Sequence, residues 1–108
     1  MDIEKWFKEG TGFDIQELRY LSPPGIPYNI YLDSIDFEGA DQKNNIKIHN
    51  ITIEHYDNKA NTSSEKAIDQ FFNKKNIKFE KSREWLNDDK LWVTIYDLEP
   101  VFEKLKGE

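Results

Sequence analysis

The sequence contains no cysteine, and this absence excludes several kinds of chemistry at once. Disulfide frameworks, zinc–thiolate sites and cysteine nucleophiles all need a thiol, so none of them is expected here. The chain also has no apolar run near the roughly 18 residues of a membrane-spanning helix, and its first residues lack the basic and apolar regions of a leader peptide. We therefore expect a protein that stays in the reducing compartment where it is made and has no membrane as a partner.

Basic residues are too few to balance the acidic ones, since 15 Lys and Arg stand against 21 Asp and Glu and the net charge is -6. Binding to a phosphate backbone depends on clustered Lys and Arg, so nucleic acid is not expected as a direct partner. Phosphate-binding loops, dinucleotide-binding glycine patterns, H-E-x-x-H and G-x-S-x-G are also missing. No segment offers a nucleophile, a base and an orienting group together, so we predict that the protein is not an enzyme and uses no cofactor.

What the chain does have is the length of one domain and many aromatic residues. Its 108 residues are expected to fold as a single domain, residues 1–108. Seven Phe, five Tyr and three Trp supply large apolar groups for one core. A third of the residues are charged, a composition typical of a globular chain rather than a disordered one when aromatics are this frequent.

The spacing of apolar residues, together with glycine, proline and capping residues, predicts the elements of the fold. Thr62 and Glu65 match a capping box, in which a hydroxyl and a carboxylate satisfy free backbone amides at a helix start. Residues 34–45 lack an apolar face and are expected to form a mobile loop at the tip of a long hairpin. In chain order we expect a helix over residues 2–9, strands over 14–21, 27–33 and 46–56, a helix from 62, strands over 77–85 and 90–98, and a short helix or a docked tail over 101–106.

These elements place the chain in the α+β class, with the order α-β-β-β-α-β-β followed by a short C-terminal helix. We expect an antiparallel sheet of four to five strands with one main helix packed on one face. Within residues 46–56 the isoleucines change parity, which indicates either a bulge near His49 and Asn50 or burial on both faces, and of these we favour the bulge. Large aromatic residues fall on the strand faces opposite the aliphatic ones and should be exposed or covered by a partner; they are Tyr31, Trp85, Trp92 and Tyr96.

Three sets of polar residues could hold a metal ion or act as acid and base, and each has a simpler interpretation. His49 and His55 are six residues apart, about 20 Å along a strand, which is too far for one ion. The acidic run from Asp33 to Asp41 does not match a calcium-binding loop. Asp88 and Asp89 fit a turn better than a catalytic pair of carboxylates. We therefore predict no metal site and no catalytic residue.

Several motifs, in order along nearly the whole chain, resemble those of a known family. They are a short helix with Trp6-Phe7, the proline-rich entry Pro23–Pro27 leading to Tyr28–Leu32, the loop Gly39–Asp41, the strand Ile51–Tyr56, the capped helix from Thr62, and Ile77–Lys81 near the final hairpin. In these features the sequence is similar to the tail-completion proteins of long-tailed bacteriophages and prophages, also called tail terminators or tail-to-head joining proteins.

The resemblance implies a structural virion protein that assembles with copies of itself. It implies a ring, usually of six copies, that ends the tail tube at its head-proximal end and joins it to the connector of the head. The partners would be the chain itself, the tail tube protein and the head-side connector protein, and the protein would be found in the bacterial host cytoplasm during assembly and in the virion tail. The tips of long hairpins would reach adjacent rings, here over residues 36–45 and 87–90.

The predicted protein contacts therefore lie on hairpin tips and on the aromatic strand faces. They are Tyr31, Asp36, Phe37, Glu38, Asp41, Lys43, Trp85, Asp88, Asp89, Trp92 and Tyr96. A second hypothesis is an acidic monomeric inhibitor or immunity protein that binds a toxin or nuclease. That hypothesis predicts carboxylates concentrated on one face, whereas this sequence spreads them over all segments among its lysines.

Overall fold

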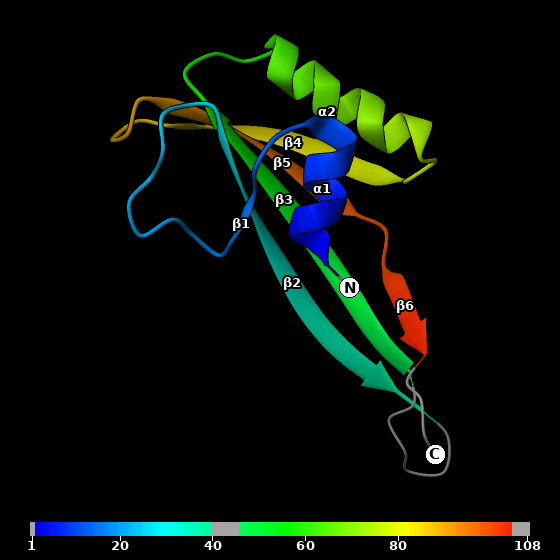
Figure 1. Cartoon of the computed structure of the whole chain (residues 1–108). Helices are drawn as coiled ribbons and strands as arrows, with labels where there is room; N and C mark the ends of the chain where they lie inside the picture. Colours follow the sequence, from blue (N-terminus) through cyan, green and yellow to red (C-terminus); the bar gives the residue numbers. More distant parts are fainter. Residues whose placement is uncertain (1, 40–45, 105–108) are drawn as a thin grey trace.

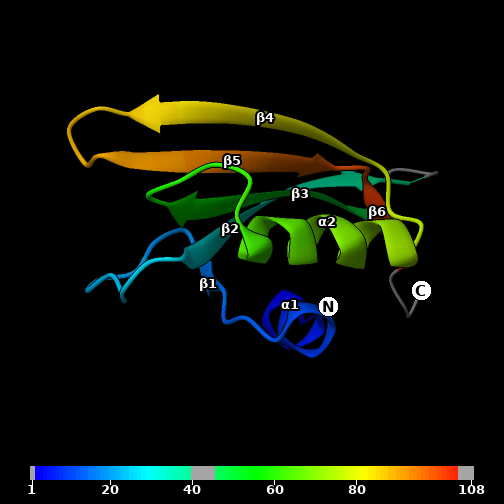
Figure 2. The same ribbon diagram turned by 90° about the horizontal axis from the view of Figure 1, so that it is seen from above.

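One six-stranded sheet carries two helices on the same face, while its other face has no helix over it (Figures 1 and 2). This computed structural model describes residues 2–39 and 46–104. The α+β class predicted from the sequence is confirmed. The elements are α1 (Ile3–Thr11), β1 (Gln16–Glu17), β2 (Tyr28–Glu38), β3 (Ile46–Asp57), α2 (Ser63–Lys74), β4 (Phe79–Leu86), β5 (Leu91–Leu98) and β6 (Val101–Lys104).

The sheet has the strand order β1-β2-β3-β5-β4, and β6 pairs with β3 beyond the end of β5. Every pair is antiparallel except β1 with β2, so the sheet is mixed and has six strands where four to five antiparallel ones were predicted. The predicted C-terminal helix is wrong, because β6 takes its place. Asp97 pairs with Thr52, and Val101 pairs with His49. The segment from Asp97 to Val101 is therefore one residue longer than the segment of β3 that it faces. Pro100 therefore lies in a bulge between two parts of one strand and does not end the sheet.

Two further predictions for the first half of the chain need correction. The strand expected over residues 14–21 is only two residues long, because Leu18 has a left-handed backbone with φ of 64° that an extended strand cannot contain. Residues 34–38, expected to be a loop, continue β2, and each pairs with β3 as far as Glu38 with Ile46. A pair of exposed strands tolerates polar side chains on both faces, so the lack of an apolar face in residues 34–38 did not exclude a strand there. The rest of that predicted loop, residues 40–45, lies outside the described residues.

The predicted bulge in β3 is also wrong. The register of β3 with β2 is continuous, and every second residue of β3 from His49 to Asp57 is buried. Both histidines therefore share one face with Ile51 and Ile53, and this face is the one that the helices cover. The isoleucines at 46 and 48 lie on the opposite, uncovered face.

The core forms where α1 and α2 pack on this covered face. Trp6, Phe7, Phe71 and Phe72 lie in or against it. Helix α1 was expected over residues 2–9, but it continues through Gly10 to Thr11. It ends at Gly12, whose φ of 84° favours glycine. Gly10 has a packing role, because a Cβ there would lie 2.0 Å from the ring of Phe71.

The predicted orientation of the aromatic strand residues is wrong in its main point. Tyr31 and Tyr96 lie in the protomer's own core, on either side of Ile53 in one row across β2, β3 and β5. Trp92 is on the same face and is partly buried. The aliphatic side chains of these strands, such as Ile30 and Ile95, instead lie on the uncovered face. Sequence parity separates two faces correctly, but it does not say which of them receives the helices.

Candidate functional site

The most distinctive surface is an arm formed by the distal halves of β2 and β3 together with β6. Figure 1 shows these strands running on past both helices, and the molecule measures 50 × 29 × 22 Å. Within the described residues, the arm consists of residues 33–38 of β2, residues 46–50 of β3 and β6. Neither described helix lies over these residues, so the exposed side chains of the arm are available to a partner, whereas His49 is buried among the strands themselves.

The arm presents apolar side chains to solvent where a monomer would normally bury them. Phe37 is 50% exposed and Ile35 is 41% exposed, and both lie on the same sheet face as the helices but beyond them. Val101 of β6 is exposed on this face as well, and Phe102 is 65% exposed on the other. Phenylalanine side chains supply large contact areas in protein interfaces. The arm therefore has the composition of a protein-binding surface.

Acidic groups flank these apolar side chains. Asp36 and Glu38 are exposed on the opposite side of β2 from Phe37, and Asp36 accepts a hydrogen bond of 3.1 Å from the side-chain amide of Asn50. Charges at the rim of an interface set its register and rate of association more than its affinity. A partner surface with basic groups beside an apolar depression would complement the arm.

Two strand edges could extend the sheet. Strand β1 pairs with β2 only at Ile30 and Tyr31, so among the described residues the edge of β2 from Leu32 to Glu38 has no strand beside it. Strand β4 forms the other edge and pairs only with β5 within residues 2–39 and 46–104. Unpaired edges offer free backbone N–H and C=O groups to a strand from another chain.

The face without helices is partly apolar. Three tyrosines pack over one end of it: Tyr28 stacks on Tyr56 with ring centroids 4.9 Å apart, and Tyr20 meets Tyr28 edge-on at 5.7 Å. Leu32 is exposed on this face beyond the tyrosines. A second, weaker contact surface is therefore available on the side opposite the helices.

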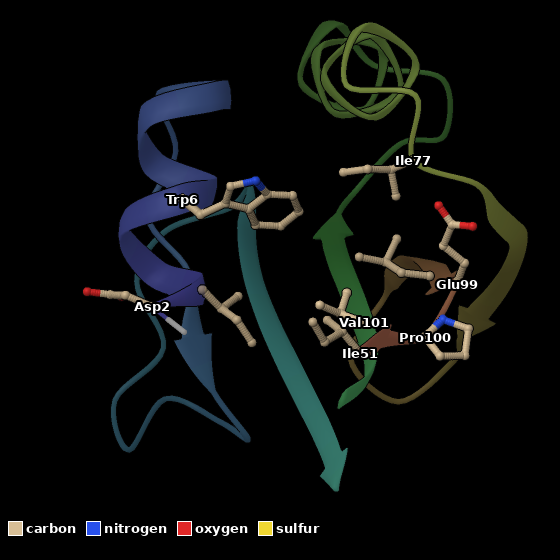
Figure 3. Close-up of a pocket in the computed structure, with 9 residues that line it drawn as sticks. Asp2, Trp6, Ile51, Ile77, Glu99, Pro100 and Val101 are labelled. Carbon is tan, nitrogen blue, oxygen red and sulfur yellow. The ribbon is translucent and has the colours of Figure 1, made fainter. Parts of the chain in front are cut away.

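A pocket of about 430 Å³ opens between α1, β3 and the bulge that joins β5 to β6 (Figure 3). Apolar side chains, including Trp6, Ile51 and Val101, line most of it, and the carboxylates of Asp2 and Glu99 stand at opposite sides of its rim. Both carboxylates already accept backbone hydrogen bonds, Asp2 from Lys5 and Glu99 from Lys78. The pocket can therefore take an apolar side chain, and its rim favours a neighbouring base.

A buried carboxylate joins α2 to β4. Glu65 is 1% exposed, its carboxylate accepts a hydrogen bond of 2.7 Å from Lys81 Nζ, and Arg83 donates another. Lys81 also binds Asp69, which accepts a hydrogen bond of 2.7 Å from the Tyr96 hydroxyl. Burial raises the pKa of Glu65, but the hydrogen bonds from Lys81 and Arg83 outweigh burial and lower this pKa to about 2. The network fixes α2 on the sheet, and none of its residues lines the pocket beside α1.

The structure also assembles a serine, a histidine and an asparagine that sequence reasoning missed. The Ser64 hydroxyl lies 3.1 Å from Nε2 of His55, and Nδ1 of His55 lies 2.7 Å from Oδ1 of Asn29. Their order imitates a nucleophile, a base and an orienting group. However, His55 is 1% exposed, burial lowers its pKa, and a neutral amide cannot stabilise an imidazolium as a carboxylate does. We interpret the chain of contacts as a tie between β2, β3 and the first turn of α2.

We expect Ser64→Ala to lower the free energy of unfolding by about 1 kcal/mol, the usual net contribution of one hydrogen bond. Urea unfolding of the variant and of Ser63→Ala, its exposed neighbour, gives the comparison. The same proteins should not react with a fluorophosphonate probe. Covalent labelling at Ser64 would instead identify it as a nucleophile and contradict the structural interpretation.

No metal site emerges from the other polar residues. Among residues 2–39 and 46–104, no three His, Asp or Glu side chains gather as a metal ion would require. Both histidines lie on the covered face of β3, and each is bonded to its own protein partners. Neither helix of the described chain is long and apolar enough to cross a membrane.

The predicted contact residues separate into three groups. Tyr31 and Tyr96 are buried in the core and cannot contact a partner in this conformation. Asp41 and Lys43 lie outside the described residues. The others lie at opposite ends of the molecule: Asp36, Phe37 and Glu38 are exposed on the arm, whereas Trp85, Asp88, Asp89 and the partly buried Trp92 lie at or beside the turn between β4 and β5. Ile35, Val101 and Phe102 were missed.

In comparisons with known proteins, the chain matches no family model and no curated protein sequence.

Proposed function

We propose that the protein is a structural component of a bacteriophage or prophage tail. In this proposal, copies of the chain form a ring, usually of six copies in such tails, at the head-proximal end of the tail tube. The ring ends the tube and joins it to the head-side connector. The protein would assemble in the bacterial host cytoplasm and remain in the virion tail.

The observation that carries this proposal is the uncovered arm with Phe37 and Ile35 exposed on it. A chain that acted alone would gain stability by burying such side chains, each of which is worth about 1.5–3 kcal/mol when fully removed from water. Two open strand edges and the helix-free sheet face add further surfaces for neighbouring copies. The order of motifs along the chain supports the choice of a tail protein over other ring-forming proteins.

The proposal predicts that Phe37→Asp prevents assembly. A carboxylate in the centre of an apolar contact should weaken association by about 2 kcal/mol or more, which corresponds to a roughly 30-fold higher dissociation constant. Analytical ultracentrifugation across a range of concentrations measures this change. Leu21→Asp is the matched control, because Leu21 is 91% exposed and lies before β2, away from the arm.

Two outcomes of this experiment and one of a separate pull-down distinguish the hypotheses. A closed ring of the wild-type chain that Phe37→Asp dissociates and Leu21→Asp leaves intact supports the proposal. A wild-type chain that stays monomeric at millimolar concentration contradicts obligatory self-association. Recovery of a nuclease or toxin in a one-to-one complex would favour the inhibitor hypothesis instead.

A further inference from the structure

His49 connects the three strands of the arm through its two ring nitrogens. Its side chain is 4% exposed. Nδ1 lies 2.7 Å from Oδ2 of Asp33 on β2, and Nε2 lies 2.8 Å from Oε1 of Glu103 on β6. The imidazole ring therefore stands between two carboxylates that come from different strands.

This geometry requires a proton on each ring nitrogen. Ionised carboxylates only accept hydrogen bonds, and a neutral imidazole has a single N–H to donate. With a neutral ring, one of the two short contacts would bring a nitrogen lone pair against a carboxylate oxygen. The imidazolium form donates to both carboxylates, so the structure matches the charged state of His49.

The charges that surround His49 support the same state. The hydrogen bond to Glu103 raises the pKa of His49, burial opposes this, and the hydrogen bond and charge of Asp33 raise it further. Lys47 pairs with Glu103 in the ladder between β3 and β6, and its charge helps to lower the pKa of Glu103. The two carboxylates differ in freedom, because the Asp33 side chain is 12% exposed and that of Glu103 is 43% exposed.

Besides its backbone ladder with β3 and the side chain of Val101 at the pocket beside Trp6 and Ile51, few described contacts hold β6 in place. Its ladder with β3 has four residue pairs, from Ile46 with Lys104 to His49 with Val101. Val101 and Phe102, its apolar residues, are both exposed. The contact between His49 and Glu103 is the only side-chain hydrogen bond or ion pair that β6 makes with the other described residues.

We propose that His49 is a proton-controlled latch for β6. While the imidazolium persists, Glu103 is held and β6 stays paired with β3. When the proton leaves, Asp33 keeps the remaining N–H and the half-exposed Glu103 turns to solvent. Strand β6 then detaches and uncovers the edge of β3 from Ile46 to His49. The latch is a property of the single chain and does not depend on ring formation.

The direction of the pH dependence follows from linkage. The pKa of His49 is raised above its ordinary value of 6.5 in the closed state, so the latch is fully closed below that value and loosens as pH rises toward the raised one. Within this window the equilibrium constant for opening should increase by up to about tenfold per pH unit, and it should level off above it.

Hydrogen exchange followed by NMR tests the latch in the intact chain. From about pH 6 to about pH 9, protection factors corrected for intrinsic exchange should fall for the amides that join β3 to β6 and stay constant for those that join β4 to β5. The ring-proton shifts of His49 should titrate over the same pH range. Constant protection of β6, or a His49 pKa at or below the ordinary value, would overturn the proposal.

Glu103→Gln is the decisive variant, because its half-exposed site leaves folding secure. The amide of glutamine can accept from the imidazolium or donate to the neutral ring, so β6 should remain protected at every pH. His49→Phe, whose ring has no nitrogen that could donate to Glu103, should leave β6 unprotected throughout. Glu80→Gln removes an exposed carboxylate from β4 and should behave as the wild type. A Glu103→Gln profile identical to that of the wild type would show that His49 does not control β6.

Discussion

Replacing Phe72 with alanine is expected to lower the free energy of unfolding by about 3–5 kcal/mol. Phe72 has no exposed surface, and its ring lies 5.3 Å from that of Phe79 and 5.4 Å from that of Tyr96, measured between centroids. It also stacks near Trp6, 6.2 Å away. One side chain therefore joins α2 to α1, β4 and β5, and its removal leaves a cavity that none of these rigid neighbours can fill.

Phe102→Ala is the matched control for this prediction, since it removes the same atoms from a side chain that is 65% exposed. Its expected effect is within about 0.5 kcal/mol, as for other surface substitutions. Urea denaturation at equilibrium measures both variants. A whole domain of this kind is stable by about 5–15 kcal/mol, so the loss expected for Phe72→Ala is a large part of that margin. Equal effects of the two substitutions would mean that Phe72 is not buried in the core as the structure shows.

The helix α2 was predictable because its sequence signals are local. Thr62 caps it by accepting a hydrogen bond from the Glu65 N–H, as the capping box predicted. The carboxylate of Glu65 then reaches the N–H of Asn61, one residue before the cap, rather than that of Thr62. The stripe of Ile68, Phe71 and Phe72 faces the core at the spacing of a helix.

The orientation of the sheet could not be obtained in the same way. Tyr96 and Ile95 alternate in β5 and both are apolar in character, so period-two spacing defines two faces without ranking them. One contact that suits the tyrosine face to α2 is the hydrogen bond that the carboxylate of Asp69 accepts from the buried Tyr96 hydroxyl. That contact joins residues 27 positions apart, and no local signal in the sequence reports it.

The arm was found only in part, for a similar reason. The acidic residues of its tip region and Phe37 were predicted as contacts, because polar hairpin ends often bind partners. The strand character of residues 34–38 and the role of Phe102 depend on pairing with β3 and β6. His49 likewise meets Glu103 across 54 positions of sequence, so its latch chemistry is visible only in the folded chain.

Glu65→Gln is expected to lower the free energy of unfolding by about 3 kcal/mol near neutral pH. The shift of the Glu65 pKa from 4.5 to about 2 corresponds to roughly this energy, because one pKa unit is worth about 1.4 kcal/mol. The neutral amide keeps the shape of the side chain and its contact with Asn61. It loses the charge that Lys81 and Arg83 approach, and these two cations remain partly buried beside it.

The pH dependence distinguishes this electrostatic effect from a simple packing defect. Because the folded-state pKa of Glu65 is depressed, its contribution is complete above pH 4.5 and is lost as pH falls toward about 2. The difference in stability between the wild type and Glu65→Gln should therefore shrink over that range, whereas Glu80→Gln on the exposed face of β4 should differ little from the wild type at any pH. A difference that stayed constant down to acidic pH would show that the charge of Glu65 and its pairing with Lys81 and Arg83 do not account for the loss of stability in Glu65→Gln.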